Sequence, residues 1–258
     1  MAKGRNYNRR RRGSGGFLYK LLSMVVICAA IITAMTLFFR VEAVKISGQA
    51  RYKESEVRAA AAVELGENLY GLNKHEIAGC IVEELPYIET VRIYRKLPST
   101  LVIEVQECGE PLAVLDSNGE NAWLISLSGK IVDRKAAMLA TDYIPISGLE
   151  LLSPSIGTRI ALSMEETGKQ ESLLALLKAL EGRGMLEQTD GIRLDDPESV
   201  YVDYAGRFTV KLGYGVDYEY KLMALQAALA DEKIQENMTG TFDLQLDDSR
   251  IFFRQNVR

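Results

Sequence analysis

The sequence has little of the chemistry on which enzymes and metal proteins depend. Its 258 residues include one histidine, His75, and three cysteines, Cys28, Cys80 and Cys108. These few residues exclude a zinc site of the usual Cys/His design. A Ser-His-Asp triad would have to use His75, which we place on the exposed first turn of a helix. We therefore expect no catalytic residue.

Phosphate and calcium loops are also lacking. Residues 213–215 contain two glycines, but the third glycine of a nucleotide-binding motif is missing. Residues 167–169 read Thr-Gly-Lys without the surrounding residues of a P-loop motif. The acidic residues at 195–198 do not have the alternating spacing of a calcium loop and indicate a solvated turn between strands. The sequence predicts neither a cofactor nor a metal site.

Acidic residues are absent from the first 40 residues, which carry eight lysines and arginines. The remaining 218 residues hold the other 23 bases and all 35 acids. The formal net charge of −4 therefore hides a basic N-terminal end and an acidic remainder. This division is typical of a chain whose two ends lie in different environments.

An uncharged apolar run separates the two parts. Residues 21–39 read LLSMVVICAAIITAMTLFF and are bracketed by Lys20 and Arg40. As a helix, the run would span about 28 Å, close to the ~30 Å hydrocarbon core of a bilayer. It has no polar face, and no convincing signal-peptide cleavage site follows it. We predict a transmembrane helix, with residues 1–20 in the cytoplasm and residues 40–258 outside.

The run from Arg9 to Arg12 has two possible roles. Such runs occur in patches that bind nucleic acid. Here, however, the run lies beside a membrane helix, and the part of the chain outside the membrane is acidic. We interpret the run as an orientation signal that also binds anionic membrane lipid, and we expect no nucleic-acid partner.

The first part outside the membrane has the pattern of a small α/β module. Three segments alternate apolar and polar residues, and two segments between them have the composition or spacing of helices. The predicted order is β-α-α-β-β. Its elements are a strand at 41–48, a helix at 53–63 that stops by Gly66, a helix that Asn73 caps and that runs to about Leu85, and strands at 91–94 and 101–106.

The rest of the chain predicts a mainly antiparallel β domain with two helices, so the fold class is α+β. Ser128-Gly129 between two apolar runs indicates a hairpin, and residues 144–148 are expected to be a break. Helices are predicted at 171–181, where closely spaced leucines form a broad apolar face, and at 217–230. Strands are predicted at 191–195, 199–204, 207–212, 241–246 and 250–255. The expected organisation is a tail at 1–20, a transmembrane helix at 21–39, and modules at 40–108 and 109–258.

The sequence of the first module resembles that of a POTRA domain of the FtsQ/DivIB cell-division family. The resemblance lies in VKISGQARYKESEV (44–57), GENLYGLNKHEI (66–77) and LPYIETVRIYRKLPSTLVIEVQE (85–107), followed by Pro111. A basic tail, one membrane span and a POTRA module directly after it form the layout of that family. Looser similarity continues through GKIVDR (129–134), residues 212–225 and TFDLQL (241–246) into the family's β domain.

The resemblance implies a bitopic scaffold of the divisome, located in the cell membrane at the division septum. Its partners would be small FtsL-like and FtsB/DivIC-like coiled-coil proteins, and the complex would help to regulate the septal peptidoglycan synthesis machinery. POTRA modules of the family act in recruitment. For that role we single out the outward-facing residues Arg92, Tyr94 and Glu104 in the hairpin formed by 88–94 and 101–106.

The C-terminal hairpin is the second candidate site. Phe252 and Phe253 are neighbours on a strand, so they point to opposite faces and cannot both enter one core. The strand is the last of the chain and is a candidate edge to which a partner could add a strand. The resemblance implies that a coiled-coil partner docks there, and it points to Leu246, Arg250, Phe252, Phe253 and Arg254 as contacts. The alternative is that both phenylalanines only cover the sheet.

Three other functions compete with this interpretation. An extracytoplasmic sensor would need a cytoplasmic tail that binds a partner, and the 20-residue tail has no apolar periodicity. A cell-wall hydrolase would need a catalytic constellation. A POTRA-type chaperone for polypeptide transport would normally precede a long β-barrel, for which no alternating region of sufficient length remains.

Overall fold

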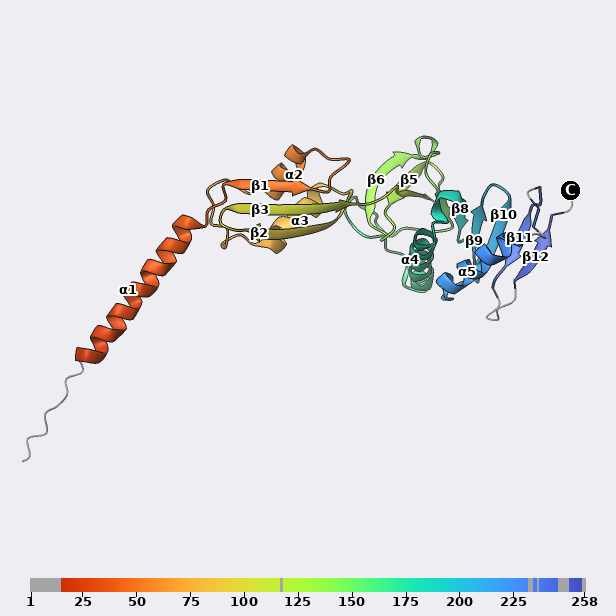
Figure 1. The fold of residues 1–258 in the computed structure, drawn as a ribbon. Coiled ribbons are helices and arrows are strands. Elements are labelled where there is room, and N and C mark those ends of the chain that lie inside the picture. Colours follow the sequence, from red (N-terminus) through yellow and green to blue (C-terminus); the bar gives the residue numbers. More distant parts are fainter. Residues whose placement is uncertain (1–14, 117, 232–233, 236, 246–250, 257–258) are drawn as a thin grey trace, which may run out of the picture.

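The chain folds into a long apolar helix and two sheets, each with two helices (Figure 1). The computed structural model describes residues 15–116, 118–231, 234–235, 237–245 and 251–256. The helices are α1 (Gly15–Phe38), α2 (Glu54–Ala61), α3 (Lys74–Glu84), α4 (Thr167–Gly182) and α5 (Tyr218–Leu229). The strands are β1 (Ala43–Ser47), β2 (Ile88–Lys96), β3 (Thr100–Glu107), β4 (Leu112–Leu115), β5 (Asn121–Ile125), β6 (Ile131–Ala136), β7 (Pro145–Ser147), β8 (Thr189–Arg193), β9 (Ser199–Tyr204), β10 (Phe208–Gly213), β11 (Gly240–Asp243) and β12 (Phe252–Gln255).

Helix α1 projects from the rest of the molecule (Figure 1). Its segment Phe17–Phe38 has a mean hydropathy of 2.5 and is not buried by any of the other residues that the structure describes. Twenty-two helical residues extend about 33 Å, which is enough to cross the ~30 Å apolar core of a bilayer. The helix begins a few residues before the predicted start at residue 21, and its length and composition fit a single-pass membrane anchor.

The first sheet confirms the predicted β-α-α-β-β order. Its strand order is β1-β3-β2, with β1 parallel and β2 antiparallel to the central β3. Helices α2 and α3 supply Val57 and Ile81 to a core that also contains Leu101 and Ile103 of β3. Alternate residues of β2 face away from this core, because side chains on a strand point alternately to its two faces.

The N-terminus of α3 agrees with the prediction, and the C-terminus of α2 does not. The Asn73 side chain accepts hydrogen bonds from the backbone N–H groups of His75 (3.2 Å) and Glu76 (3.5 Å), so the predicted N-cap of α3 is confirmed. The predicted stop of α2 at Gly66 is wrong. The helix ends at Ala61, and Ala62 adopts a left-handed φ of +49°. Glycine is the usual residue at such a position, which is why the pattern favoured Gly66.

The second sheet has nine strands in the order β12-β11-β10-β9-β8-β7-β4-β5-β6. Five of its eight pairings are antiparallel, so the predicted mainly antiparallel sheet with two helices is confirmed. The break expected at 144–148 is wrong, because β7 lies there in the middle of the sheet. The buried Ile146 pairs with β4 and β8 in parallel.

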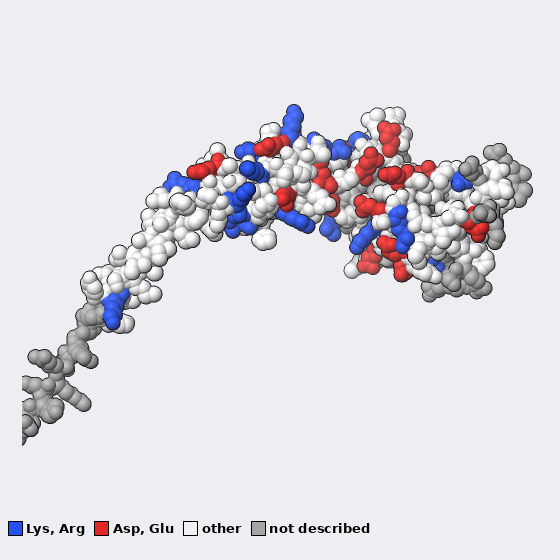
Figure 2. All heavy atoms as spheres, viewed as in Figure 1, with Lys and Arg blue, Asp and Glu red and all other residues white. Residues whose placement is uncertain are grey.

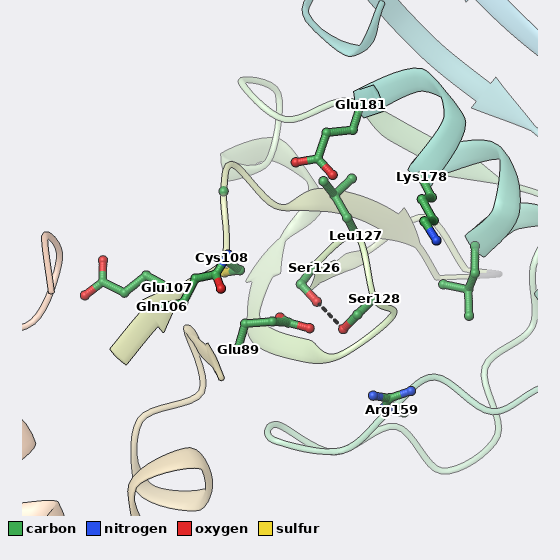
Figure 3. A pocket seen from close by; sticks show the side chains of 12 residues that line it. Glu89, Gln106, Glu107, Cys108, Ser126, Leu127, Ser128, Arg159, Lys178 and Glu181 are labelled. Atoms are coloured by element: carbon green, nitrogen blue, oxygen red, sulfur yellow. Dashed lines mark hydrogen bonds between the residues drawn. The ribbon is translucent and has the colours of Figure 1, made fainter. Parts of the chain in front are cut away.

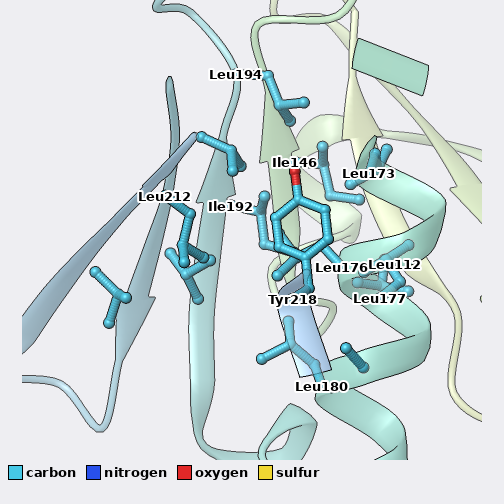
Figure 4. Close-up of a cluster of buried hydrophobic side chains, with 14 of the residues drawn as sticks. Leu112, Ile146, Leu173, Leu176, Leu177, Leu180, Ile192, Leu194, Leu212 and Tyr218 are labelled. Atoms are coloured by element: carbon cyan, nitrogen blue, oxygen red, sulfur yellow. The ribbon is translucent and has the colours of Figure 1, made fainter. Parts of the chain in front are cut away.

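The main core lies between this sheet and helices α4 and α5. Figure 4 shows leucines of α4 packed with Tyr218 of α5 against strand residues such as Ile146 and Ile192. Leu173, Leu176, Leu177 and Leu180 of α4 are all fully buried. The broad leucine face predicted from helical spacing therefore covers one face of the sheet.

A smaller apolar cluster lies where the two modules meet. Its buried members are Ala113, Ala122, Leu124, Val132 and Ala140. Tyr87 of the first module packs against this cluster and donates a hydrogen bond from its hydroxyl to Asp133 Oδ2 (3.3 Å). The chain passes from the first module to the second at the same place, and there Cys108 N–H donates a hydrogen bond to the Tyr87 carbonyl at 2.8 Å. The two modules thus share a packed junction.

Candidate functional site

Strand β12 forms one edge of the nine-stranded sheet. Among the described strands it pairs only with β11, antiparallel, with Phe252 opposite Asp243, Phe253 opposite Phe242 and Arg254 opposite Thr241. Figure 1 shows this edge at the end of the molecule opposite α1. The sequence predicts an edge strand here, and the strand order places it at an edge.

The free backbone groups of the edge can be assigned to particular residues. Asn256 N–H donates to the Thr239 carbonyl (2.9 Å), while Gly240 N–H donates to Arg207 on the other side of β11 (3.2 Å). Hydrogen-bonded and non-hydrogen-bonded pairs alternate along an antiparallel ladder. The N–H and C=O groups of Phe253 and Gln255 therefore point outward, away from β11. An added strand would find its donors and acceptors there.

The two phenylalanines of β12 point to opposite faces, as their adjacency predicts. The ring of Phe253 packs 4.7 Å from that of Phe242 and 6.1 Å from that of Phe208, measured between centroids. Phe252 is 49% exposed, and Arg254 beside it on the same face is also exposed. Phe253 is thus partly buried against the core, while Phe252 and Arg254 supply the accessible surface on the opposite face of the strand.

Gly240 allows β12 to sit close to β11. A Cβ atom at this position would lie 2.7 Å from the ring of Phe253 and would also collide with the Arg254 carbonyl oxygen. A side chain would therefore push β12 away from the sheet. This role of Gly240 was not predicted, although a glycine directly before the alternating run TFDL is a signal for close backbone approach.

An apolar groove of about 480 Å³ borders the edge strand. Its walls come from the end of α5, the segment after it, and β11 and β12. The lining residues are Ala228, Asp231, Ile234, Met238, Phe242, Ile251, Phe253 and Gln255. An edge strand with a groove beside it has both features of strand-addition sites: main-chain partners and a pocket for side chains.

The second predicted site lies on the first sheet. Arg92 and Glu104 are directly opposite each other on β2 and β3, and Tyr94 Oη donates to Glu104 Oε1 at 2.7 Å. This hydrogen bond to a carboxylate raises the pKa of Tyr94. Both Arg92 and Tyr94 are exposed. The structure therefore brings the three predicted residues together on the sheet face that the helices do not cover.

Only part of the predicted POTRA hairpin is an edge. Strand β3 is central, with β1 on one side and β2 on the other, so the segment 101–106 has no free backbone edge. The spacing within the hairpin does not report this pairing, since the parallel partner β1 is more than 50 residues away in sequence. Only β2 offers a free edge in the half of the sheet that holds Arg92 and Tyr94.

A cavity of about 420 Å³ whose lining includes several charged side chains lies between the modules (Figure 3). Glu89 and Cys108 line it from the first module, and Ser126, Arg159 and Lys178 line it from the second. The hydroxyl groups of Ser126 and Ser128 are 3.1 Å apart.

Acidic and basic side chains are interspersed along the face of the molecule shown in Figure 2. Among the residues that the structure describes, no three His, Cys, Asp or Glu side chains are grouped to hold a metal ion.

Comparison with known proteins places this architecture in a family. Residues 39–107 match the model of the FtsQ-type POTRA domain. The cell division protein DivIB of Clostridium botulinum is 23% identical over 238 residues, which cover 92% of this chain and 88% of that protein. This chain belongs to the FtsQ/DivIB family of cell division proteins.

Relatives named FtsQ extend the similarity to other bacterial groups. FtsQ of Geotalea daltonii is 26% identical over 226 residues, covering 85% of this chain and 78% of that protein. FtsQ of Streptomyces venezuelae is 36% identical over 83 residues, or 32% of this chain and 30% of that protein. The similarity to the longer matches spans both sheets, so the family assignment does not depend on the POTRA module alone.

Proposed function

We propose that this chain is a non-catalytic, bitopic scaffold of the divisome. In this proposal residues 1–20 lie in the cytoplasm, residues 21–39 cross the cell membrane, and a POTRA domain (40–108) and a β domain (109–258) lie outside at the division septum. Its partners are FtsL-like and FtsB/DivIC-like coiled-coil proteins, through which it helps to regulate septal peptidoglycan synthesis. Membership of a family of cell division proteins and the exposed apolar helix α1 support this proposal.

The free edge of β12 is the single observation that supports a docking role best. The outward N–H and C=O groups of Phe253 and Gln255 are available to an extended partner segment, and the apolar groove beside them can take its side chains. Phe252 and Arg254 would contact the partner from the exposed face. Arg254 favours an acidic partner segment. Phe253, a further predicted contact, would meet the partner in the groove that it lines. Leu246 and Arg250, the remaining predicted contacts, lie outside the described residues and stay predictions.

One substitution pair tests the docking mode directly. Gln255→Pro removes an outward N–H donor without breaking the ladder to β11, because proline is tolerated on an edge strand. Gln255→Ala keeps the donor and serves as the matched control. With the protein's own FtsB/DivIC-like partner, we expect Gln255→Pro to bind about tenfold more weakly than Gln255→Ala. Both variants lack the Gln255 side chain of the groove, and only Gln255→Pro lacks the N–H group.

The measurement is the dissociation constant of the purified full-length protein in detergent or nanodiscs, with circular dichroism to verify the fold. Arg254→Glu and Phe252→Ser, which change only exposed side chains of β12, should also weaken binding. Unchanged affinity of the folded Gln255→Pro variant would show that the partner does not add a strand at this edge.

A further inference from the structure

The exposed apolar side chains of the first module gather at one end of it. In the fully described segment 40–107, four large apolar or aromatic residues are exposed: Leu65 (64%), Tyr70 (47%), Tyr94 (43%) and Leu97 (55%). The hydroxyl of Tyr94 is bonded to Glu104 on the open sheet face. The other three lie in two loops, the one between α2 and α3 and the one between β2 and β3. We call Leu65, Tyr70 and Leu97 the apolar rim.

Both loops are hydrogen-bonded to the first residues after α1. Gly66 N–H donates to the Val41 carbonyl, and Leu69 N–H donates to the Phe39 carbonyl, each at 2.8 Å. On the other side, Glu42 N–H donates to the Ser99 carbonyl at 2.8 Å. These bonds hold the loops that carry the apolar rim beside residues 39–42. The rim therefore lies at the level where the apolar helix ends.

Aromatic side chains join the rim to the helix. The ring of Phe39 meets the ring of Tyr70 edge-on at 5.2 Å and that of Phe38 at 5.3 Å. Phe38 is 68% exposed on the last turn of α1, so the apolar surface of the helix continues through Phe39 to Tyr70. Arg95 holds the Tyr70 loop in place, because its Nε donates to the Leu69 carbonyl at 2.6 Å.

Charges around the rim have both signs. Arg40 and Lys96 are exposed there, as are the acidic residues Glu42, Glu64 and Glu67. The arrangement favours neither an anionic nor a cationic partner. Exposed leucines beside a tyrosine, surrounded by mixed charges and continuous with a membrane helix, match the boundary between lipid headgroups and acyl chains.

We propose that the apolar rim is seated in the outer headgroup layer of the bilayer that α1 crosses. The occupant of this surface is lipid, and the POTRA module stands on the membrane instead of swinging from the end of α1. Anchors at the interface fix the tilt of a membrane helix, so the rim would also set the direction in which the two sheets extend. This inference rests on the proposed membrane anchor.

Tryptophan quenching by brominated lipid tests the proposal in the full-length protein. The chain has one tryptophan, Trp123, on β5 of the second sheet, and it gives a constant background. Leu97→Trp places a probe in the rim. Leu152→Trp is the matched control, since Leu152 is similarly exposed (52%) but belongs to the second module. Phe38→Trp reports on α1 itself. Each variant is reconstituted alone into nanodiscs whose lipids carry bromine near the headgroups.

We expect strong quenching of the new tryptophan in Leu97→Trp and Phe38→Trp, and none in Leu152→Trp. Quenching in Phe38→Trp without quenching in Leu97→Trp would overturn the inference and leave the anchor standing; the rim would then face water or a partner protein. Equal quenching in Leu97→Trp and Leu152→Trp would overturn it as well, because any exposed tryptophan would then reach the lipid. No quenching in Phe38→Trp would contradict the membrane anchor and the inference together.

Discussion

Lys130 of the second module caps helix α3 of the first, with Nζ 2.9 Å from the Val82 carbonyl oxygen. This carbonyl belongs to the last turn of α3, where backbone acceptors have no partner within the helix. A second bond, to the Ile88 carbonyl (3.0 Å), completes the contact. Lys130 is only 6% exposed, and this burial lowers its pKa. One buried ammonium group thus satisfies two carbonyls of the neighbouring module.

Replacing this lysine should loosen the junction. Lys130→Met keeps the length of the side chain but removes its N–H donors, so the two carbonyl groups lose their hydrogen bonds. The substitution also removes the free-energy cost of burying a charge, which offsets part of this loss. We expect a net loss of about 2 kcal/mol in the free energy of unfolding. Chemical denaturation of residues 40–258 measures it. Lys178→Met, at an exposed position on α4, should change stability by less than about 0.5 kcal/mol. Equal effects of the two substitutions would contradict the capping role.

Gly240→Ala should displace β12 selectively. The added methyl group collides with the Phe253 ring and the Arg254 carbonyl, at a cost of about 1–3 kcal/mol. Hydrogen exchange should show faster exchange of the Asn256 amide, which is bonded to Thr239, with the first module unchanged. Gly168→Ala on α4 is the control, since nothing lies within 4 Å of its added Cβ. Retained protection of Asn256 would show that the strand adapts.

The open face of the first sheet should affect recruitment more than stability. Alanine at Arg92, Tyr94 and Glu104 together removes exposed side chains and one surface hydrogen bond, which costs about 1 kcal/mol or less. We expect fluorescent fusions of this triple variant to lose midcell localisation while thermal unfolding shifts little. Lys45→Ala with Ser47→Ala changes exposed residues of the opposite edge strand, β1, and should localise normally. Normal localisation of a folded triple variant would remove the proposed recruitment role.

Alkaline pH should destabilise the protein through two tyrosines. Burial, followed by the nearby Asp133 carboxylate, raises the pKa of Tyr87 from 10.0 to about 12. Burial and Asp196 raise the pKa of Tyr214 from 10.0 to about 12. Between pH 10 and 12 the folded state therefore holds more protons than the unfolded state, and stability falls as pH rises.

Urea denaturation of residues 40–258 at a series of pH values across that range checks this expectation. Tyr87→Phe and Tyr214→Phe should each flatten the decline, because each removes one group that the folded state keeps protonated. A decline that is as steep in both variants as in the parent protein would assign the alkaline sensitivity to other groups.

The features that could be predicted from the sequence are those that depend on spacing within one helix or strand. The alternation in β2, the Asn73 cap and the leucine face of α4 follow from spacing along a single element. Strand β7 was missed because three residues starting with Pro145 carry no strand signal, and parallel pairing with β4 and β8 stabilises them.

The candidate sites show the same limit. Adjacent Phe252 and Phe253 were enough to predict opposite faces, and the final strand was a reasonable candidate for an edge. The groove beside the edge and the cap formed by Lys130 join residues that are distant in sequence. No local spacing reports such contacts, because they depend on how the elements are placed in three dimensions.

The end-to-end order of α1, the first sheet and the second sheet places the free edge of β12 at the far end from the anchor (Figure 1). With the anchor in the membrane, this order fixes the distance between the bilayer and the edge of β12. A partner anchored in the same bilayer reaches the edge only if the region between its membrane segment and its docking segment spans that distance. The length of that region would then contribute to partner selection before any side chain makes contact.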